Sequence, residues 1–339
     1  MMSDKTVSHL DAPASARSAR ERFSPGRMLS WVSGYETLVL LALLIVAFTL
    51  ASDRFLTADN LQNVALVQAV TATMTLAVLM PLIIGEFDLS VGYLIGFLVM
   101  LEAVVAQHTS NPVLVMAAGP VVGLLVGLAN GMLTVYFKIS SFIATLGVGI
   151  LLSGATQGIS NGKVIFENIP SSLTSLAADD FLGLSLAVWL TLLLAVILFY
   201  VLEHTPQGRF WYAIGGSERV AYLAGVRTNR MRMTAFAASG LIVGIASNFA
   251  LAQAGSANPG YGPELLLPAY AAAFLGVATY RPGYYNVLGA LVAIILLAIG
   301  FNGLSLLGVP FWVQPIFNGS VLIIAVLVAR QETRQVRTG

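Results

Sequence analysis

Residues 182–202 read LGLSLAVWLTLLLAVILFYVL and contain no charged side chain. Residues 285–304, which read YNVLGALVAIILLAIGFNGL, are equally apolar. Because an α-helix rises about 1.5 Å per residue, roughly 20 apolar residues suffice to cross the hydrocarbon core of a bilayer. Irregular backbone and open strand edges cannot face lipid, so both stretches predict membrane-spanning helices.

The whole chain has the composition of a membrane protein. Of its 339 residues, 57% are hydrophobic and 10% are charged, and the mean hydropathy is +0.84. So few polar side chains cannot cover a soluble globule of this size, and lipid must cover the rest. We therefore expect an all-α fold, a polytopic transmembrane helical bundle.

Apolar blocks divide the chain into about ten expected spans. They lie at 35–51, 62–84, 91–107, 112–136, 140–159, 182–202, 233–254, 264–280, 285–304 and 311–329. This division places all but Arg54 and Lys163 of the 17 Lys and Arg residues on one side of the membrane. Cationic residues concentrate in cytoplasmic loops, so we expect both chain ends in the cytoplasm and the protein in the bacterial inner membrane. The basic surface follows from this topology rather than from nucleic-acid binding.

The polar ends of the chain lie outside this bundle. Residues 1–33, which are rich in Ser, Ala and Arg, are expected to form a disordered cytoplasmic tail, with a cleaved signal peptide as the alternative. Residues 34–330 form the expected transmembrane domain, and residues 331–339 form a second cytoplasmic tail.

Two connections are long enough to dock other proteins, 161–181 on the outer side and 203–232 on the inner side. Charged candidates for an outer partner are Arg54, Lys163, Asp179 and Asp180. In the inner connection, Ser217 fits the N-cap of a short helix at 218–224 that Gly225 would end. The helix would present Tyr222 and Leu223 beside Arg219, which suits a soluble partner. An amphipathic helix resting on the lipid interface is the alternative.

A polar interruption separates two apolar runs at Gly85-Glu86-Phe87-Asp88-Leu89-Ser90-Val91-Gly92. Its glycines permit a turn or unwound backbone, and carboxylates within a membrane are functional hypotheses by default. The segment is either a tight hairpin at the cytoplasmic surface or a broken helix at membrane depth. A plain polar turn, in which Asp88 or Ser90 caps the next helix, is the alternative without a functional role.

Other polar or small residues interrupt the apolar helices. Asn130 lies about two turns from the end of a span, where its amide needs either another helix or a passing solute as a partner. Glu264 stands at the start of a helix, where the helix dipole favours a carboxylate. Both 85–89 and 262–265 read Gly, one or two residues, acid and Leu, which indicates an internal repeat. A stripe of small residues predicts close helix packing at Gly119, Gly123, Gly127 and Gly131.

The sequence excludes several kinds of chemistry. It has no cysteine, and its three histidines, His9, His108 and His204, are too far apart to suggest a ligand cluster, so we expect no disulfide, metal site or cofactor. A membrane enzyme would need converging catalytic groups, which are absent.

Five motifs follow one another along the chain: EFDLSVG at 86–92, NG at 130–131, FIATLG at 142–147, GRFWYAIGGSE at 208–218 and NGLSLLG at 302–308. In this order they resemble the membrane permease of ribose-type ABC importers, over roughly residues 35–329. The resemblance implies a homodimeric or heterodimeric channel, embedded in lipid, for a monosaccharide or related polyol. A periplasmic sugar-binding protein would deliver the solute, and a separate cytoplasmic ATPase would supply the energy, so the chain itself needs no ATP site.

The resemblance also suggests roles for particular residues. The ATPase would push on the helix at 217–225, and the coupling residues would be Gly208, Arg209, Gly215, Gly216, Ser217, Glu218, Arg219, Tyr222 and Gly225. A hydroxyl-rich solute would meet donors and acceptors in transit, for which the candidates are Glu86, Asp88, Ser90, Asn130, Thr145, Gln157, Glu264 and Asn302.

Two segments depart from the family pattern. Glu86 stands where a second small residue is usual, and 279–284 reads Thr-Tyr-Arg-Pro-Gly-Tyr where a Gly-rich turn is expected. These differences alter a gate or a neighbouring surface, so the sequence does not identify the solute. An ion-coupled secondary transporter is the alternative, but it would need a buried ionisable relay, and Glu102 is the only acid well inside an expected span.

Overall fold

The computed structural model describes residues 36–310 and 312–338, most of which are helical. The helices are α3 (Glu36–Ala51), α4 (Ala58–Ile83), α5 (Val91–His108), α6 (Pro112–Val135), α7 (Ser141–Ser160), α8 (Ser171–Ala178), α9 (Leu186–His204), α10 (Pro206–Gly216), α11 (Glu218–Leu223), α12 (Thr228–Ala254), α13 (Pro263–Leu275), α14 (Val287–Leu306) and α15 (Val313–Thr338). A 3-10 turn, η2 (Gly276–Ala278), follows α13, and β1 (Asp180–Phe181) pairs with β2 (Leu184–Ser185). The expected N-terminal tail at 1–33 lies outside the described residues.

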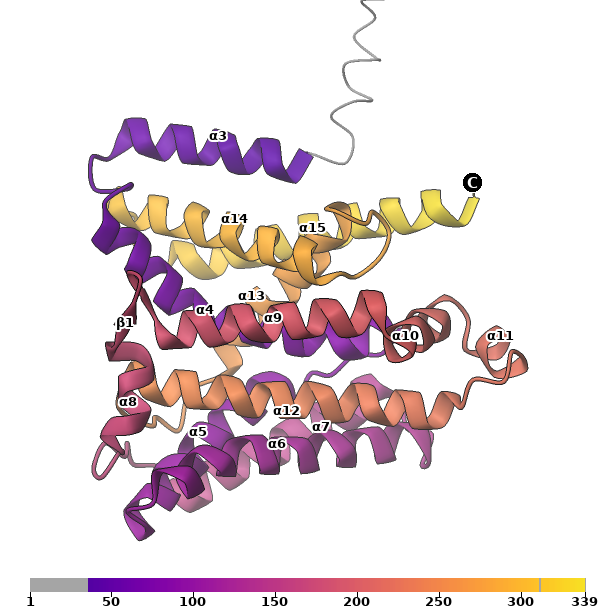
Figure 1. Ribbon diagram of the computed structural model, residues 1–339, viewed down its shortest axis with the longest axis horizontal. Helices are drawn as coiled ribbons and strands as arrows, with labels where there is room; N and C mark the ends of the chain where they lie inside the picture. Colours follow the sequence, from indigo (N-terminus) through magenta and orange to yellow (C-terminus); the bar gives the residue numbers. More distant parts are fainter. Residues whose placement is uncertain (1–35, 311, 339) are drawn as a thin grey trace, which may run out of the picture.

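The long helices run roughly parallel to the longest axis of the molecule (Figure 1). They are stacked from α3 and α14 through α4 and α9 to α12 and then α6. Two ends result, one with α10 and α11, which we call the α11 end, and one with α8 and β1, which we call the α8 end (Figure 1). In the centre, α4 is buried from Ala69 to Ile83 except at Thr71, and α12 is buried over most of its length.

Seven of the described helices are long and apolar enough to cross a membrane, namely α4, α5, α6, α7, α9, α12 and α14. Three shorter apolar helices accompany them at Thr37–Ala51, Pro263–Ala278 and Val313–Leu327. Each expected span coincides with one of these helices. The chain is therefore a multi-pass helical membrane protein. The last helix continues through residues 331–338, which were expected as a tail.

The inner connection at 203–232 is mostly helical, although we expected a loop with one short helix. Helix α10 begins at Pro206, which suits the first helical position, and buries Trp211 and Ile214. Gly215 brings α10 against the end of α4, because an ideal Cβ there would lie 1.9 Å from the Ile83 carbonyl oxygen. This apolar face spans only a few residues, so the polar residues around it gave the segment the composition of a loop.

The outer connection at 161–181 is also more ordered than a loop. Helix α8 buries Leu173, and an isolated β-bridge joins Ile165 to Ala257. The expected span at 182–202 starts as a helix only at α9, because Leu182 and Gly183 adopt positive φ angles of 52° and 79° and form the turn between β1 and β2.

The expected close packing along the glycine stripe of α6 is confirmed. An ideal Cβ on Gly123 would lie 2.2 Å from the Gly240 carbonyl oxygen, and one on Gly127 would lie 2.3 Å from the Phe236 carbonyl oxygen. On α12, an ideal Cβ on Gly240 would likewise lie 2.1 Å from the Gly123 carbonyl oxygen. Backbones that meet this closely fix α6 against α12.

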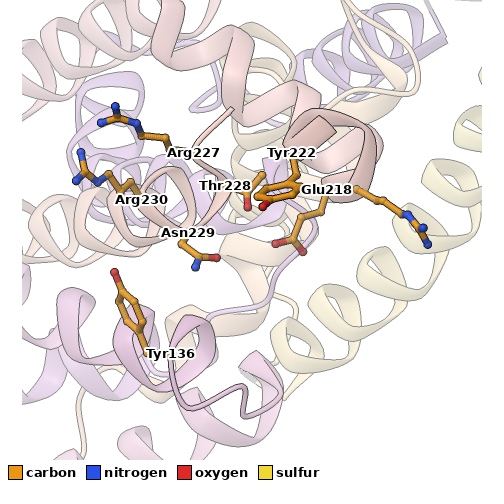
Figure 2. A pocket seen from close by; sticks show the side chains of 8 residues that line it. Tyr136, Glu218, Tyr222, Arg227, Thr228, Asn229 and Arg230 are labelled. Atoms are coloured by element: carbon orange, nitrogen blue, oxygen red, sulfur yellow. The ribbon is translucent and has the colours of Figure 1, made fainter. Parts of the chain in front are cut away.

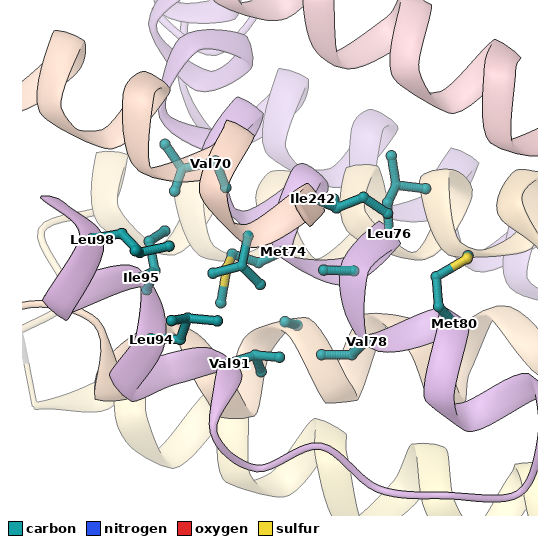
Figure 3. Close-up of a cluster of buried hydrophobic side chains, with 14 of the residues drawn as sticks. Val70, Met74, Leu76, Val78, Met80, Val91, Leu94, Ile95, Leu98 and Ile242 are labelled. Carbon is teal, nitrogen blue, oxygen red and sulfur yellow. The ribbon is translucent and has the colours of Figure 1, made fainter. Parts of the chain in front are cut away.

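The two copies of the Gly-acid-Leu pattern, at 85–89 and 262–265, lie in or next to two unwound segments. After α4 the chain turns back along the helix, at residues 84–90, before α5 begins at Val91 (Figure 3). After α12 it unwinds again at 255–262 before α13 begins. Each segment contains a glycine with positive φ just past its long helix, Gly85 and Gly255 respectively. Helix α5 then packs against the second segment and the start of α13, with Gly96 against the Tyr261 carbonyl oxygen and Gly92 against Leu266.

Candidate functional site

A buried polar cluster forms where the chain turns back after α4. Asp88, Ser90 and Asn130 are completely buried. The Asp88 Oδ1 atom accepts hydrogen bonds from the Ser90 hydroxyl at 2.6 Å and from the Asn130 Nδ2 at 3.3 Å, and Asn130 also donates to the Ser90 hydroxyl at 2.8 Å. The Ser239 hydroxyl of α12 donates to Asp88 Oδ2 at 3.4 Å. Three of the candidate translocation residues are thus in one cluster.

The backbone of this segment is held from several sides. Four successive amides donate to three helices: Glu86 to the Pro81 carbonyl at 2.9 Å, Phe87 to the Ser141 hydroxyl at 3.2 Å, Asp88 to the Tyr270 hydroxyl at 3.0 Å, and Leu89 to the Thr145 hydroxyl at 3.0 Å. Residues 85–90, which we call the polar return, therefore connect α4, α7 and α13, and their buried carboxylate adds α6 and α12. This arrangement is what the broken-helix alternative requires.

Asp88 and Ser90 were both candidates to cap α5, and only Asp88 does so. The Asp88 carboxylate accepts the Ser90 amide hydrogen at 3.1 Å, so Asp88 supports the start of α5. The Ser90 side chain makes no capping bond and donates to Asp88 instead. The capping that the plain-turn alternative expects is therefore present at Asp88, on a carboxylate that is also completely buried.

Two buried acceptors beside the polar return lack a partner among the described residues. They are Asn130 Oδ1 and Thr134 Oγ1, one helical turn apart on α6. Thr134 lines an open cavity of about 710 Å³ between the α6–α7 turn and α11, together with Glu86 and Ser141. Unpaired buried polar atoms are costly, and these two can bond to water or to a hydroxyl group of a solute.

An ion-pair bridge joins the polar return to the α11 end. The guanidinium of Arg232, near the start of α12, contacts Glu86 through Nη2 and Glu218 through Nη1, the latter at 3.0 Å. Glu86 and Arg232 are mostly buried, with side chains 17% and 15% exposed, whereas Glu218 is 48% exposed. Glu86 was expected to face a solute, but its carboxylate is engaged with Arg232.

Helix α11 forms as the sequence predicts, over Glu218–Leu223. The Ser217 hydroxyl accepts the Val220 amide hydrogen, and Gly225 follows with a φ of 86°. Its outer side is unusually apolar for an exposed turn, since Tyr222 is 67% and Leu223 76% exposed.

A second open cavity of about 710 Å³ lies beside α11 (Figure 2). Tyr136 lies across the opening from Tyr222 and Glu218, and Arg227 and Arg230 project from the start of α12 (Figure 2). Arg219 completes a basic rim. This combination of exposed aromatic and cationic side chains is typical of protein interfaces.

The other candidate coupling residues lie in or next to α10. Gly208 and Gly215 are packing positions, against Leu202 and Ile83 respectively. Gly216 has open space around it, and Arg209 is exposed. The sequence-based set therefore comprises exposed residues on both α10 and α11 and two glycines, Gly208 and Gly215, that pack α10 against its neighbours.

A second ion pair fixes α10 on its other side. Arg281 contacts Glu203 at 2.9 Å and lies over the rings of Tyr212 and Tyr284, 5.5 Å and 5.4 Å from their centroids. The Tyr212 hydroxyl donates to the Tyr285 carbonyl at 2.7 Å. Burial, and after it the Glu203 carboxylate, raise the pKa of Tyr212 above its ordinary value, so it remains a donor.

Three candidate translocation residues lie apart from the polar cluster. Asn302 exchanges two hydrogen bonds with Asn60, at 2.9 Å and 3.0 Å. Gln157 is exposed near the end of α7. Glu264 is exposed at the start of α13, where its carboxylate accepts the Gly262 amide hydrogen at 3.0 Å.

Glu264 belongs to a groove that sequence reasoning missed. This open cavity of about 480 Å³ lies among α4, α13, α14, α15 and the end of α12. Its polar lining comprises Gln68, Thr71, Gln253, Glu264, Gln314 and Asn318. A lone amide in an apolar helix, the signal that pointed to Asn130, also marks Gln68, Gln314 and Asn318.

The expected outer docking residues, Arg54, Lys163, Asp179 and Asp180, are all exposed and lie in the connections α3–α4, α7–α8 and α8–α9. No ion pair involves them within the described part of the chain. Among the residues that the structure describes, no three His, Asp or Glu side chains gather as a metal site.

Glu102, the acid that a secondary transporter would need, is enclosed. Its carboxylate accepts the Ser247 hydroxyl hydrogen at 2.5 Å and faces Gly119 of α6, where an ideal Cβ would lie 1.9 Å from Oε1. No ion pair reaches it among the described residues. The acid is therefore enclosed between α5, α6 and α12.

Comparisons with known proteins are consistent with this arrangement. The family model described as branched-chain amino acid transport system / permease component matches residues 60–326. The ribose import permease protein RbsC of Escherichia coli (strain K12) is 30% identical over 307 residues, which cover 88% of this chain and 94% of that protein. The L-arabinose transport system permease protein AraH of the same organism is 31% identical over 340 residues, 99% of this chain and 100% of that protein. The L-arabinose ABC transporter permease protein AraH of Azospirillum brasilense is 28% identical over 326 residues, 96% and 94% of the two chains. No solved structure matches the chain.

Proposed function

The chain belongs to the family of permease components of the branched-chain amino acid transport system, and because similar proteins are named as ribose and L-arabinose permeases, we propose that it imports a monosaccharide or related polyol. It would do so as the membrane subunit of an ABC importer, with a periplasmic binding protein that delivers the solute and a separate cytoplasmic ATPase. The resemblance to ribose-type permeases is confirmed, since relatives named as ribose and arabinose permeases align with most of the chain.

The topology that we propose has ten spans in the bacterial inner membrane, with the α11 end and both chain ends in the cytoplasm. The seven long apolar helices and the three shorter ones supply the spans. Arg209, Arg219, Arg227 and Arg230 cluster at the α11 end, where cationic residues are expected to remain on the cytoplasmic side. Residues 34–330 then form the permease domain, flanked by cytoplasmic tails.

The surface of α11 is the observation that best supports docking of an ATPase. It presents exposed Tyr222 and Leu223 inside a basic rim, on a short helix that projects from the bundle and is joined through Arg232 to the polar return. An ATPase that grips this helix would act on the buried cluster through the bridge. Switching between two packings of the bundle is the general way in which such a push changes access to a solute.

The solute path that we propose begins in the groove at the α8 end. Lipid cannot satisfy the groove's amides and carboxylate, so a second copy of the permease, or a paralogue, would enclose it as a polar channel. Its volume of about 480 Å³ falls in the range of small-molecule sites. Further along the path, Asn130 and Thr134 offer unpaired acceptors to a hydroxyl-rich solute. The binding protein would dock on the same end, at Arg54, Lys163, Asp179 and Asp180.

The function is tested by reconstitution of the permease into proteoliposomes with its ATPase and its solute-binding protein. We expect sugar uptake only when both partners and ATP are present. Uptake by the permease alone, driven by an ion gradient, would overturn the proposal and favour a secondary transporter.

The docking of the ATPase on α11 has a direct test because the chain contains no cysteine. In the complete importer, a Tyr222→Cys variant should crosslink to the ATPase. Leu182→Cys, at an equally exposed position at the opposite end, is the matched control and should not crosslink. The reverse pattern would place α11 away from the ATPase.

A further inference from the structure

Three charged side chains from distant parts of the sequence form one bridge. Glu86 follows α4, Glu218 opens α11, and Arg232 lies near the start of α12. The guanidinium of Arg232 uses separate nitrogens for the two carboxylates, so both contacts exist at once. A fork of donors of this kind fixes the relative positions of both partners, which a point charge would not.

The position of Arg232 shows that the bridge is needed to hold it. A mostly buried cation is costly unless carboxylates compensate its charge, and Glu86 and Glu218 do so here. Arg232 is mostly buried, whereas its neighbour Arg230 is exposed. Its two acidic partners therefore determine where the guanidinium lies.

The two ends of the bridge have different surroundings. Glu218 is half exposed and belongs to the short helix that we assign to ATPase docking. Glu86 is mostly buried and is followed directly by Phe87 and Asp88, whose amides bond to α7 and α13. Displacement of α11 must either pull the polar return along through Arg232 or break a half-buried ion pair.

We infer that Arg232 is the positioning residue that couples α11 to the polar return, so that ATPase-driven movement of α11 changes the packing of Asp88 and its partners. This inference rests on the proposed function. It assigns Arg232 and Glu86 to coupling rather than to contact with the solute.

The test uses the complete importer in proteoliposomes and measures solute imported per ATP hydrolysed. Arg232→Gln keeps a polar side chain but shortens it and removes the charge, and should lower this ratio about fivefold or more. Glu86→Gln should lower it similarly, and the double variant should be no worse than either single one, because all three remove the same link. ATPase assembly, followed by the crosslink from Tyr222→Cys, should be unchanged.

Arg281→Gln is the matched control, because it removes an ion pair at the same end of the molecule that does not reach the polar return. Its ratio should equal that of the wild type. Should Arg232→Gln fail to fold, Glu218→Gln replaces it, since that side chain is 48% exposed and its loss does not disturb the core.

A ratio for Arg232→Gln and Glu86→Gln within about twofold of the wild type would overturn the inference. So would equal losses in Arg281→Gln, since the effect would then come from general loosening. The wild-type importer is measured first, because absence of solute-dependent ATP hydrolysis there would contradict the proposed function and not this inference.

Discussion

The two segments where the chain unwinds after a long central helix are held in different ways. In the polar return after α4, a buried carboxylate, two hydroxyls and an amide exchange hydrogen bonds across α5, α6 and α12. In residues 255–262 after α12, side-chain bonds stay local, as from the Gly260 amide to Asn258 Oδ1, and the contact with α5 is backbone against glycine. Hydrogen bonds can be exchanged for others, whereas close backbone contacts permit one arrangement. The polar return is therefore suited to switching, and residues 255–262 are suited to acting as a fixed pivot.

The largest loss of stability is expected at the contact between Gly96 of α5 and the backbone of residues 255–262. Gly96→Ala places a Cβ about 2.0 Å from the Tyr261 carbonyl oxygen, and backbone on both sides cannot yield. We expect a loss of more than about 3 kcal/mol in unfolding free energy, measured by thermal unfolding in detergent.

Gly147→Ala is the control for that variant. No heavy atom lies within 4 Å of the Cβ that it adds on α7, and alanine favours a helix over glycine, so its melting temperature should not fall below that of the wild type. Equal melting temperatures for the two variants would mean that α5 and α13 are not locked by their backbones.

A smaller loss of stability is expected in the polar return, combined with a larger loss of transport. Asp88→Ala leaves the hydroxyls of Ser90 and Ser239 and the amide of Asn130 without their shared acceptor, at a cost of about 2–3 kcal/mol. Solute uptake in proteoliposomes should be lost even at temperatures where the protein remains folded. An Asp88→Ala variant that transports normally would remove the polar return from the mechanism.

Loss of the ion pair between Arg281 and Glu203, which contacts neither segment, should lower stability less than Asp88→Ala does. Arg281→Gln loses an exposed contact with Glu203 and a position over two tyrosine rings, worth about 1 kcal/mol together. Uptake should be unaffected, while proteolysis should cut the α9–α10 junction slightly faster. Strong loss of uptake would mean that loosening this end of the bundle impairs transport by itself.

The smallest effect is expected for the local bond in the fixed segment. Asn258→Ala removes an exposed hydrogen bond to the Gly260 amide, worth about 0.5–1 kcal/mol. The difference in unfolding free energy between Asn258→Ala and Asp88→Ala then measures how much burial and long-range partners add to the stabilisation by such a side chain. An Asn258→Ala variant as inactive as Asp88→Ala would place the switch at both segments.

The sequence predicts the helices well because lipid imposes a simple rule. Blocks of apolar residues coincide with helices along the described chain, and Ser217 and Gly225 bound α11 as their capping chemistry requires. Helix α10 was not predicted, because its buried face consists only of Trp211, Ile214 and two close-packed glycines, which is too few apolar residues to show a helical pattern.

The site could be predicted only in part, because its contacts join residues far apart in sequence. Local motifs identified Asp88, Ser90 and Asn130. A carboxylate, a hydroxyl and an amide in apolar surroundings need polar partners, and these three side chains hydrogen-bond to one another. Nothing local indicates that Glu86 meets Arg232, which is 146 residues further along the chain. Likewise, Asn302 reads as a solute contact until its partner Asn60 is seen.

The most direct test of the contrast between the two segments is backbone hydrogen exchange in the complete importer, with and without ATP. We predict that the exchange rates of the amides of residues 86–89 change on ATP binding, because their acceptors lie on helices that move relative to one another. The amides of residues 255–262 should exchange at the same rate in both states. Equal rates at 86–89 in both states, or a change confined to 255–262, would contradict the assignment of the polar return as the switch.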